Sequence, residues 1–367
     1  VGWFSAALYW LVRRPGNRLG LFLLALAVAL AAISLQGATQ PHLRSIGVLA
    51  NAAVFLLVFY VILAFPEGRI VSRFGWALLG AMSLETLVSY GPTLLFSAVV
   101  YGRAPLAGCN AACPENGFMI ADRPTLADGF FSRDVTGYYL LAAFSAFFVY
   151  LIYRLATATR PRRRALLPVY VPVLMSTVAA LALYGVLVER VHVDASTLSK
   201  VGWMSTIGYS AIPYGFLLSI VVSTFFAATA LKKIVSRLVE SPSASQLRTT
   251  LADALDDPSL ELGFRLEQAH GFLDSSGKPL ASTPPAGQSS TPVTRNGETA
   301  AVIMHDAALD TDPELVAAAG QALLLAIENG RLTAELQSTN EELRATRARI
   351  VATGDAQRRK IERDLHD

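Results

Sequence analysis

Long apolar stretches dominate the first 231 residues of the chain, and they restrict its fold more than any other feature. A membrane-spanning helix needs about 20 mostly apolar residues. The stretches that meet this length are roughly Leu19–Gln36, Ile46–Phe65, Phe74–Val100, Tyr138–Ala156, Leu166–Val188 and Val201–Leu231. Over the whole chain, 53% of residues are hydrophobic and 16% are charged, which is too apolar for an ordinary soluble domain. The sequence therefore predicts a mainly α membrane protein in which residues 1–231 form a six-helix transmembrane bundle.

A shorter apolar run, VGWFSAALYWLV, precedes these stretches. It is too short to cross a bilayer alone, so we expect it to be the end of a further segment, which would give seven spans in the intact protein. Basic residues follow this run instead of preceding it, which is not the pattern of a cleavable signal peptide. At the other end, the helical pattern of AQRRKIERDLHD has no cap after it, and we expect the chain to continue there as well.

Basic residues gather in alternate loops between the apolar stretches. Up to Leu231 the chain has 16 Lys or Arg and 8 Asp or Glu, whereas the rest of the chain has 15 and 20. The basic loop residues are Arg13, Arg14, Arg18, Arg69, Arg73, Arg160, Arg162, Arg163, Arg164, Lys232, Lys233 and Arg237. Short loops rich in Lys and Arg stay on the cytoplasmic side. We therefore expect a multi-pass protein of the plasma membrane, in contact with membrane lipid, whose C-terminal half is cytoplasmic.

Both cysteines of the chain, Cys109 and Cys113, lie in the longest of the opposite loops. Because the extracytoplasmic side is oxidising, they are candidates for a disulfide. The alternative is a pair of free thiols that act only as small side chains. A bond that closes so short a loop would stabilise the local turn more than the whole fold.

One ionisable residue, Glu85, lies well inside an expected span. A carboxyl group at that depth is costly unless it is protonated, paired or facing a cavity. Glu85 is therefore a candidate for sensing a signal. The alternative is a neutral glutamic acid that hydrogen-bonds a neighbouring helix.

Residues 232–311 predict a small cytoplasmic module. The segment PSASQLRTTLADALDDP predicts a short amphipathic helix with leucines at i, i+4 and i+8. Alternating apolar and polar stretches follow, and Asn296 with Gly297 predicts a hairpin turn between two of them. A helix and an antiparallel sheet of this size indicate a reduced PAS-like or GAF-like module.

The histidines of this module, His270 and His305, are its only soft metal ligands. They are far apart in the sequence and lie in no cluster of cysteines or acids. We therefore expect no metal or haem site.

Residues 312–355 predict a long helix that forms a parallel coiled coil with a second copy. Leu336, Leu343 and Ile350 recur every seven residues. The second row of the seam consists of Leu332, Thr339, Thr346 and Thr353. The threonines make the seam weak, which suits a helix that shifts when a signal arrives and is equally typical of a plain dimer stalk.

The final segment, residues 356–367, contains the motif RRKIERDLHD. Ile361 and Leu365 define a new buried face of the helix, and at about 100° per residue His366 lies roughly 120° away from it, facing water. Asp367 follows His366 directly. A lone histidine on a charged helix is usually only a solvated residue, so the motif has to be weighed with its surroundings.

In its position after a multi-span domain, a small module and a coil, this motif resembles the start of the dimerisation and phosphotransfer helix in sensor histidine kinases of the NarX and DesK type. The loops RRPGNRLG and FPEGRIVSR are similar to juxtamembrane loops of actinobacterial multi-span members. The resemblance implies that His366 accepts phosphate and that Asp367 orients or deprotonates its imidazole. It also implies a homodimer, a LuxR-type or NarL-type response regulator as partner, and ATP with Mg²⁺ in a separate catalytic domain.

The sequence lacks the glutamine, the second helix and the ATP-binding domain that follow this motif in the family, and it contains no GxxxxGK[ST] phosphate loop. We therefore expect an input-and-acceptor part of a kinase that holds no cofactor, is inactive alone and binds no nucleic acid directly. One alternative is a non-enzymatic membrane receptor or scaffold that dimerises through its coil. A transporter is less well supported, because the spans show no internal repeat and contain one buried charge.

Overall fold

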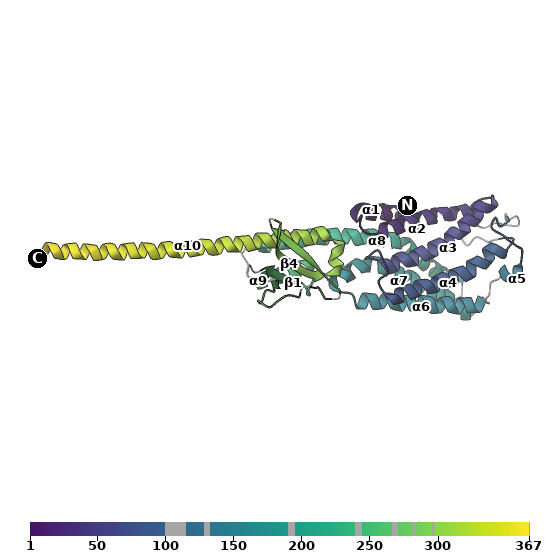
Figure 1. The fold of residues 1–367 in the computed structure, drawn as a ribbon. Coiled ribbons are helices and arrows are strands. Elements are labelled where there is room, and N and C mark those ends of the chain that lie inside the picture. Colours follow the sequence, from purple (N-terminus) through teal and green to yellow (C-terminus); the bar gives the residue numbers. More distant parts are fainter. Residues whose placement is uncertain are drawn as a thin grey trace. The chain divides into compact units, whose positions relative to one another are not determined.

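The computed structural model describes residues 1–99, 115–127, 133–189, 195–238, 244–265, 271–281, 283–285, 287–295 and 297–366. The chain divides into two compact units, Val1–Phe225 and Phe226–Asp367. The described part of the first unit is helical, and that of the second combines helices with a small antiparallel sheet (Figure 1).

The helices of the first unit are α1 (Gly2–Arg13), α2 (Leu19–Ala32), α3 (Pro41–Ala64), α4 (Arg73–Phe96), α5 (Pro124–Ala127), α6 (Arg133–Ala156) and α7 (Arg160–Glu189). A 3-10 turn, η1 (Ile33–Gly37), follows α2. Helix α8 (Ala195–Leu238) begins in the first unit and ends in the second.

Within the described residues, five helical segments are long and apolar enough to cross a membrane: Leu19–Gly37, Pro41–Ala64, Thr136–Ala156, Arg160–Leu183 and Lys200–Ile234. They correspond to five of the expected spans and support a multi-pass membrane protein. The remaining expected span, Phe74–Val100, contains most of α4, which is less apolar because it contains Glu85, Pro92 and several glycine, serine and threonine residues. That α4 crosses the membrane stays a prediction.

An aromatic core joins distant segments of the first unit. Trp10 of α1, Phe65 after α3 and Phe216 of α8 are almost completely buried. The ring centroids of Trp10 and Phe65 are 5.8 Å apart and those of Phe65 and Phe216 are 5.2 Å apart, both in edge-on geometry. Edge-on ring contacts stabilise beyond the area that they bury. The N-terminal apolar run thus forms a helix, α1, that packs within the unit.

Helices α7 and α8 approach each other closely because small residues of α8 face α7. A Cβ atom built on Gly215 would overlap the carbonyl oxygen of Pro168, and one built on Gly208 would overlap the Oγ of Ser176. Lipid tails are as apolar as leucine, so helices in a membrane associate through close packing of this kind.

The second unit contains α9 (Ala244–Leu255), β1 (Glu261–Arg265), β2 (Phe272–Leu273), β3 (Gln288–Arg295), β4 (Glu298–Asp306), the 3-10 turn η2 (Ala307–Thr311) and α10 (Pro313–His366). The described strands form an antiparallel sheet in the order β2-β1-β4-β3. Strands β3 and β4 form the predicted hairpin, and Gly297 in its turn has a φ of +85°. Asn296 lies outside the described residues.

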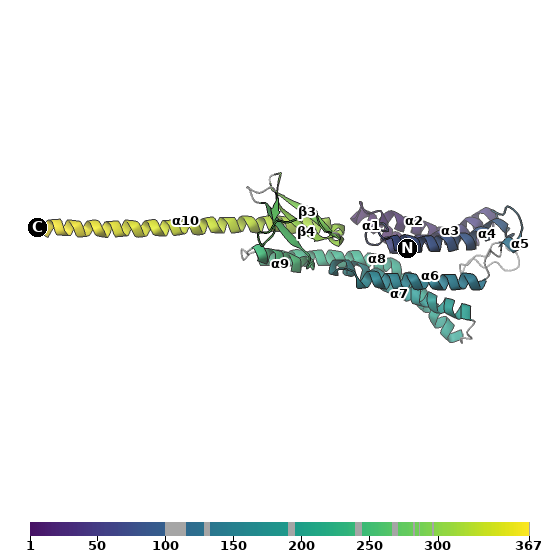
Figure 2. The ribbon, with the colours of Figure 1, turned by 60° about the horizontal axis from the view of Figure 1, so that its bottom comes forward.

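One hydrophobic core holds the second unit together. Leu247, Leu251 and Leu255 of α9 are buried, which confirms the predicted amphipathic helix. They share this core with apolar residues of β1, β3 and β4 and with α10 as far as Ala326. The strands lie against the first turns of α10 (Figure 2). The long helix therefore starts as part of the module's core.

The close contact between α7 and α8 gives a testable expectation. Gly215→Ala should destabilise the protein by about 1–3 kcal/mol, because the added methyl group needs space that the Pro168 carbonyl fills. Gly202→Ala on the same helix is the matched control, since a Cβ there has no neighbour within 4 Å. Thermal unfolding in detergent micelles measures both, and equal melting temperatures would contradict the close contact.

Candidate functional site

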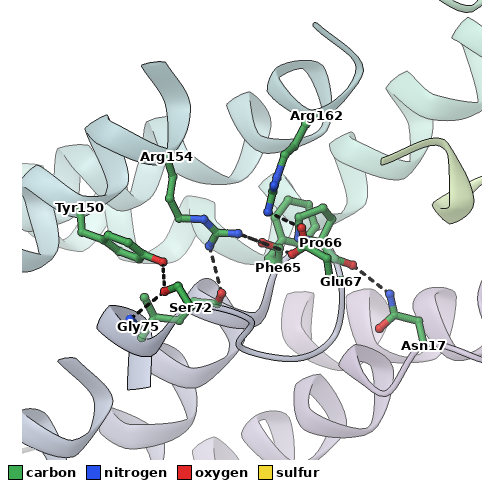
Figure 3. Close-up of polar contacts among 10 residues, drawn as sticks. Asn17, Phe65, Pro66, Glu67, Ser72, Gly75, Tyr150, Arg154 and Arg162 are labelled. Atoms are coloured by element: carbon green, nitrogen blue, oxygen red, sulfur yellow. Dashed lines mark hydrogen bonds and ion pairs between the residues drawn. The ribbon is translucent and has the colours of Figure 1, made fainter. Parts of the chain in front are cut away.

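A polar cluster surrounds the loop of residues 65–72 between α3 and α4 (Figure 3). Arg154 of α6 donates from Nη1 to the carbonyl oxygen of Leu63 at 2.9 Å and from Nη2 to that of Phe65 at 3.0 Å. The last carbonyl groups of a helix have no partner within the helix, so the guanidinium caps α3. The Arg154 side chain is only 11% exposed.

Glu67 supplies the negative charge of this cluster. One of its carboxylate oxygens is 3.5 Å from Nη2 of Arg154, and the other pairs with Arg162 in the first turn of α7. Glu67 is the only acidic residue in the sequence of the three arginine-bearing loops, which are residues 13–18, 65–73 and 157–164. One carboxylate therefore links the α3–α4 loop to both α6 and α7.

Asn17 holds the same loop from the connection between α1 and α2. Its Nδ2 donates to the carbonyl oxygen of Pro66 at 2.9 Å, and its Oδ1 accepts from the backbone N–H of Leu19 at 2.9 Å. Gly68 has a φ of +74°, and a Cβ atom there would overlap the Oδ1 of Asn17. Glycine is required at position 68 both by the backbone conformation and by this close approach.

The cluster thus connects three helical hairpins at one end of the unit. Its chemistry suits mechanical coupling, because the carboxylate is paired and the guanidinium of Arg154 is bound to helix carbonyls. The sequence pattern uses Arg162 only as a sign of orientation and selects neither Arg154 nor Glu67 as a site residue. Its position as a lone acid among three basic loops is the signal that could have identified it.

A second buried polar group lies where α3 begins. Arg44 is 4% exposed and donates from Nη1 to the carbonyl oxygen of Gln36 at 2.9 Å. Ser45 donates to Oδ1 of Asn116 at 2.9 Å, and Nδ2 of Asn116 donates to the carbonyl oxygen of Leu94 at 2.7 Å. These contacts join the start of α3 to the end of α4. Its members are far apart along the chain, so no local pattern in the sequence predicts this group.

Glu85, the predicted sensing residue, is half-buried on α4. Its Oε1 accepts a hydrogen bond from the hydroxyl of Ser89 at 2.8 Å, one turn further along the same helix. Nearby, Tyr139 of α6 donates to the carbonyl oxygen of Ala81 at 2.7 Å and joins the two helices. A role of Glu85 in sensing stays a prediction.

An ion pair connects the sheet of the second unit to α10. Nη1 of Arg295 on β3 lies 2.8 Å from Oε2 of Glu328, and Nη2 of Arg331 lies 2.9 Å from Oε1. The hydrogen bond from Arg331, together with the charge of Arg295, holds the pKa of Glu328 below its ordinary value. The same carboxylate raises the pKa of Arg331. The contact follows Ala326, the last core residue of α10, and extends the attachment of the helix to the sheet.

Beyond this contact, α10 carries the predicted seam on its surface. Leu336 is 65% exposed, Leu343 is 53% exposed and Ile350 is 66% exposed in the single chain. Each seam threonine donates its hydroxyl to a carbonyl one turn back, with Thr339 at 2.8 Å and Thr346 at 2.9 Å. The threonine side chains can therefore be covered by a second helix without leaving an unpaired hydroxyl.

The remaining predicted site residues lie at or beyond the limits of the described structure. His366 is the last residue of α10, but its side chain and the whole of Asp367 lie outside the described part. Cys109 and Cys113, and His270 of the module, are also outside it. The structure therefore does not test the phospho-acceptor pair or the disulfide.

His305 is completely buried at the end of β4. Its Nε2 lies 2.9 Å from the Oγ1 of Thr291, and its Nδ1 lies 3.0 Å from the carbonyl oxygen of Asp306. Because a carbonyl oxygen can only accept, Nδ1 carries the proton. These bonds satisfy both nitrogens of the imidazole within the module.

Comparisons of the chain with protein family models, with curated proteins and with solved structures gave no match.

The cluster at residues 65–72 yields a prediction about the relative weight of its two arginines. Arg154→Met should destabilise the protein by about 3 kcal/mol or more, because it leaves two buried carbonyl groups without their donor and removes one of the two cations beside Glu67. Arg162→Met should cost about 1 kcal/mol or less, since that side chain is 37% exposed. Thermal unfolding in lipid nanodiscs compares the two, and equal losses would show that capping of α3 contributes little.

Proposed function

We propose that this chain is the input and phospho-acceptor part of a membrane sensor histidine kinase. One observation carries the proposal: a single continuous helix, α10, runs from the core of the small module to His366 within the RRKIERDLHD segment. The 40 residues from Ala326 to His366 span about 60 Å at the helical rise per residue. A movement of the module can therefore reach the histidine through one rigid element.

The proposed active form is a parallel homodimer joined along the seam of α10. Three large apolar side chains more than half exposed on one helix are costly in water and are covered when a second copy pairs with them. In a parallel pair, Glu342 would lie beside Arg347 of the partner subunit, because these positions flank the seam with opposite charge. The same seam fits a receptor that signals by dimerisation alone, so the seam does not decide between kinase and scaffold.

The chemistry proposed for His366 is nucleophilic attack on the γ-phosphate of ATP. A neutral imidazole nitrogen forms the N–P bond, the bond between the γ-phosphorus and the bridging oxygen of ADP breaks, and a proton leaves the ring. A carboxylate at Asp367 can hold the other ring N–H and stabilise the positive charge that forms on attack. A separate catalytic domain supplies ATP and Mg²⁺, and a response regulator of the LuxR or NarL type then takes the phosphoryl group.

Phosphorylation of His366 is tested in the full-length gene product, or in this chain with the catalytic domain of a close relative added in trans. Label from γ-labelled ATP should appear on this chain as a phosphoramidate, which is stable in base and lost in acid. His366→Gln should abolish the label. His305→Gln is the control among the other histidines and should keep it.

Label that persists in His366→Gln, or that survives acid, would reject the kinase proposal. The receptor or scaffold would then be the better interpretation of the same coil. Circular dichroism of each variant checks that the loss of label does not reflect a loss of helix.

Self-association through the seam is tested with residues 226–367, which contain the complete core of the second unit. Leu343→Asp should weaken the dimer about 100-fold or more, because each dimer buries two copies of the leucine at roughly 1.5–3 kcal/mol each. Val351→Asp is the matched control, since Val351 is 63% exposed but lies outside the seam. Analytical ultracentrifugation measures both, and an unmutated fragment that stays monomeric at every concentration would refute the dimer.

A further inference from the structure

The outer side of the α3–α4 loop carries exposed basic and apolar residues next to one another. Arg69 and Arg73 are exposed, and between them Val71 is 69% exposed. The first turn of α4 continues this surface with Phe74 at 52% and Trp76 at 54% exposure. The loop follows α3 directly, and α3 is long and apolar enough to span the membrane, so these residues lie at a boundary of the bilayer.

The contacts on the inner side hold this loop in one conformation. Ile70 is buried, and Ser72 pairs with the hydroxyl of Tyr150 at 2.5 Å while it accepts the backbone N–H of Gly75 at 2.8 Å (Figure 3). Side chains alternate between the two sides of an extended segment. With Ile70 and Ser72 turned inward, residues 69 and 71 are turned outward.

Trp76 fixes the start of α4 against the same loop. Its indole Nε1 donates to the carbonyl oxygen of Ile70 at 3.1 Å, so the polar atom of the ring is satisfied within the protein. The residue as a whole is nevertheless 54% exposed. Tryptophan in this setting is typical of the boundary between lipid tails and headgroups.

The guanidinium groups of Arg69 and Arg73 differ from other arginines at this end of the unit. Arg154 and Arg162 are bound to Glu67, and Arg163 donates to the carbonyl oxygens of Leu155 and Ala156. Within the described part of the chain, the guanidinium groups of Arg69 and Arg73 make no hydrogen bond or ion pair. The one carboxylate of the three loops is already neutralised, so this part of the surface has uncompensated positive charge.

From this arrangement we propose that Arg69, Val71, Arg73, Phe74 and Trp76 form a binding surface for the headgroup of an anionic phospholipid. The two guanidinium groups bind the phosphodiester and the additional negative group of the lipid, and the apolar and aromatic side chains contact the start of its acyl chains. A zwitterionic headgroup leaves part of this positive charge uncompensated. The proposal does not depend on the kinase assignment, because every residue in it belongs to the first unit.

Fluorescence quenching with the full chain in lipid vesicles tests the surface. The vesicles contain phosphatidylcholine with a small fraction of brominated phosphatidylglycerol or, in parallel, of brominated phosphatidylcholine. The signal of Trp76 is the difference between the unmutated protein and Trp76→Phe. We expect brominated phosphatidylglycerol to quench this signal at a roughly 25-fold lower mole fraction than brominated phosphatidylcholine, because each of the two arginines contributes about fivefold.

The preference for phosphatidylglycerol over phosphatidylcholine should fall about fivefold in Arg69→Gln. It should fall about fivefold again in the double variant that also carries Arg73→Gln. Arg13→Gln with Arg18→Gln is the matched control, because it removes two charges from another loop at the same end and should leave the Trp76 signal unchanged. Equal quenching by the two lipids in the unmutated protein would overturn the proposal. So would an unchanged preference in the Arg69/Arg73 double variant, or loss of the preference on addition of millimolar glycerol phosphate, which would indicate a site for free phosphate.

Discussion

Backbone groups cannot remain unpaired in hydrocarbon, and this constraint underlies the structure of the first unit. Each segment that is apolar enough to enter the membrane must satisfy its own N–H and C=O groups, which a helix does. The groups left over are the carbonyls and amides at helix ends, where the chain also has to turn. Arg154, which binds the carbonyl oxygens of Leu63 and Phe65 at the end of α3, shows how the chain satisfies such groups.

From that constraint follows the way in which the helices are connected. Apolar side chains gain little by packing together inside lipid, so specific contacts have to join the hairpins. Close backbone approach at Gly208 and Gly215 joins α7 to α8, and edge-on rings join α1, the α3–α4 loop and α8. Glu67, shared between Arg154 and Arg162, joins α6 and α7 to the same loop. A displacement of one helical hairpin at this end would therefore also displace the hairpins that contact it.

The second unit works under the opposite condition, because it has to exclude water from a small core. Its core is formed by the leucines of α9, the inner face of the sheet, the first turns of α10, and Ala230 and Ile234 near the end of α8. The pair between Arg295 and Glu328 extends the attachment of α10 beyond that core. Further along, the described side chains from Arg331 onward are exposed in the single chain, and the row of Leu336, Leu343 and Ile350 is the basis of the proposed dimer.

Several features were determined by the sequence alone, because they depend on local patterns. The lengths of the apolar stretches predicted the spanning helices, the spacing of Leu247, Leu251 and Leu255 predicted α9, and the turn before Gly297 predicted the hairpin of β3 and β4. The expected span Phe74–Val100 shows the limit of this approach, since the glycines, hydroxyl residues and Glu85 of α4 leave its apolarity below that of the other spans.

The polar clusters around Glu67 and Arg44 were decided only by the tertiary structure. Their members come from loops far apart in the chain, and a charge in a sequence does not show which partner it meets. Burial also depends on contacts between segments, which is why the structure alone separates Arg154, bound inside the unit, from Arg69 and Arg73, which face outward beside it.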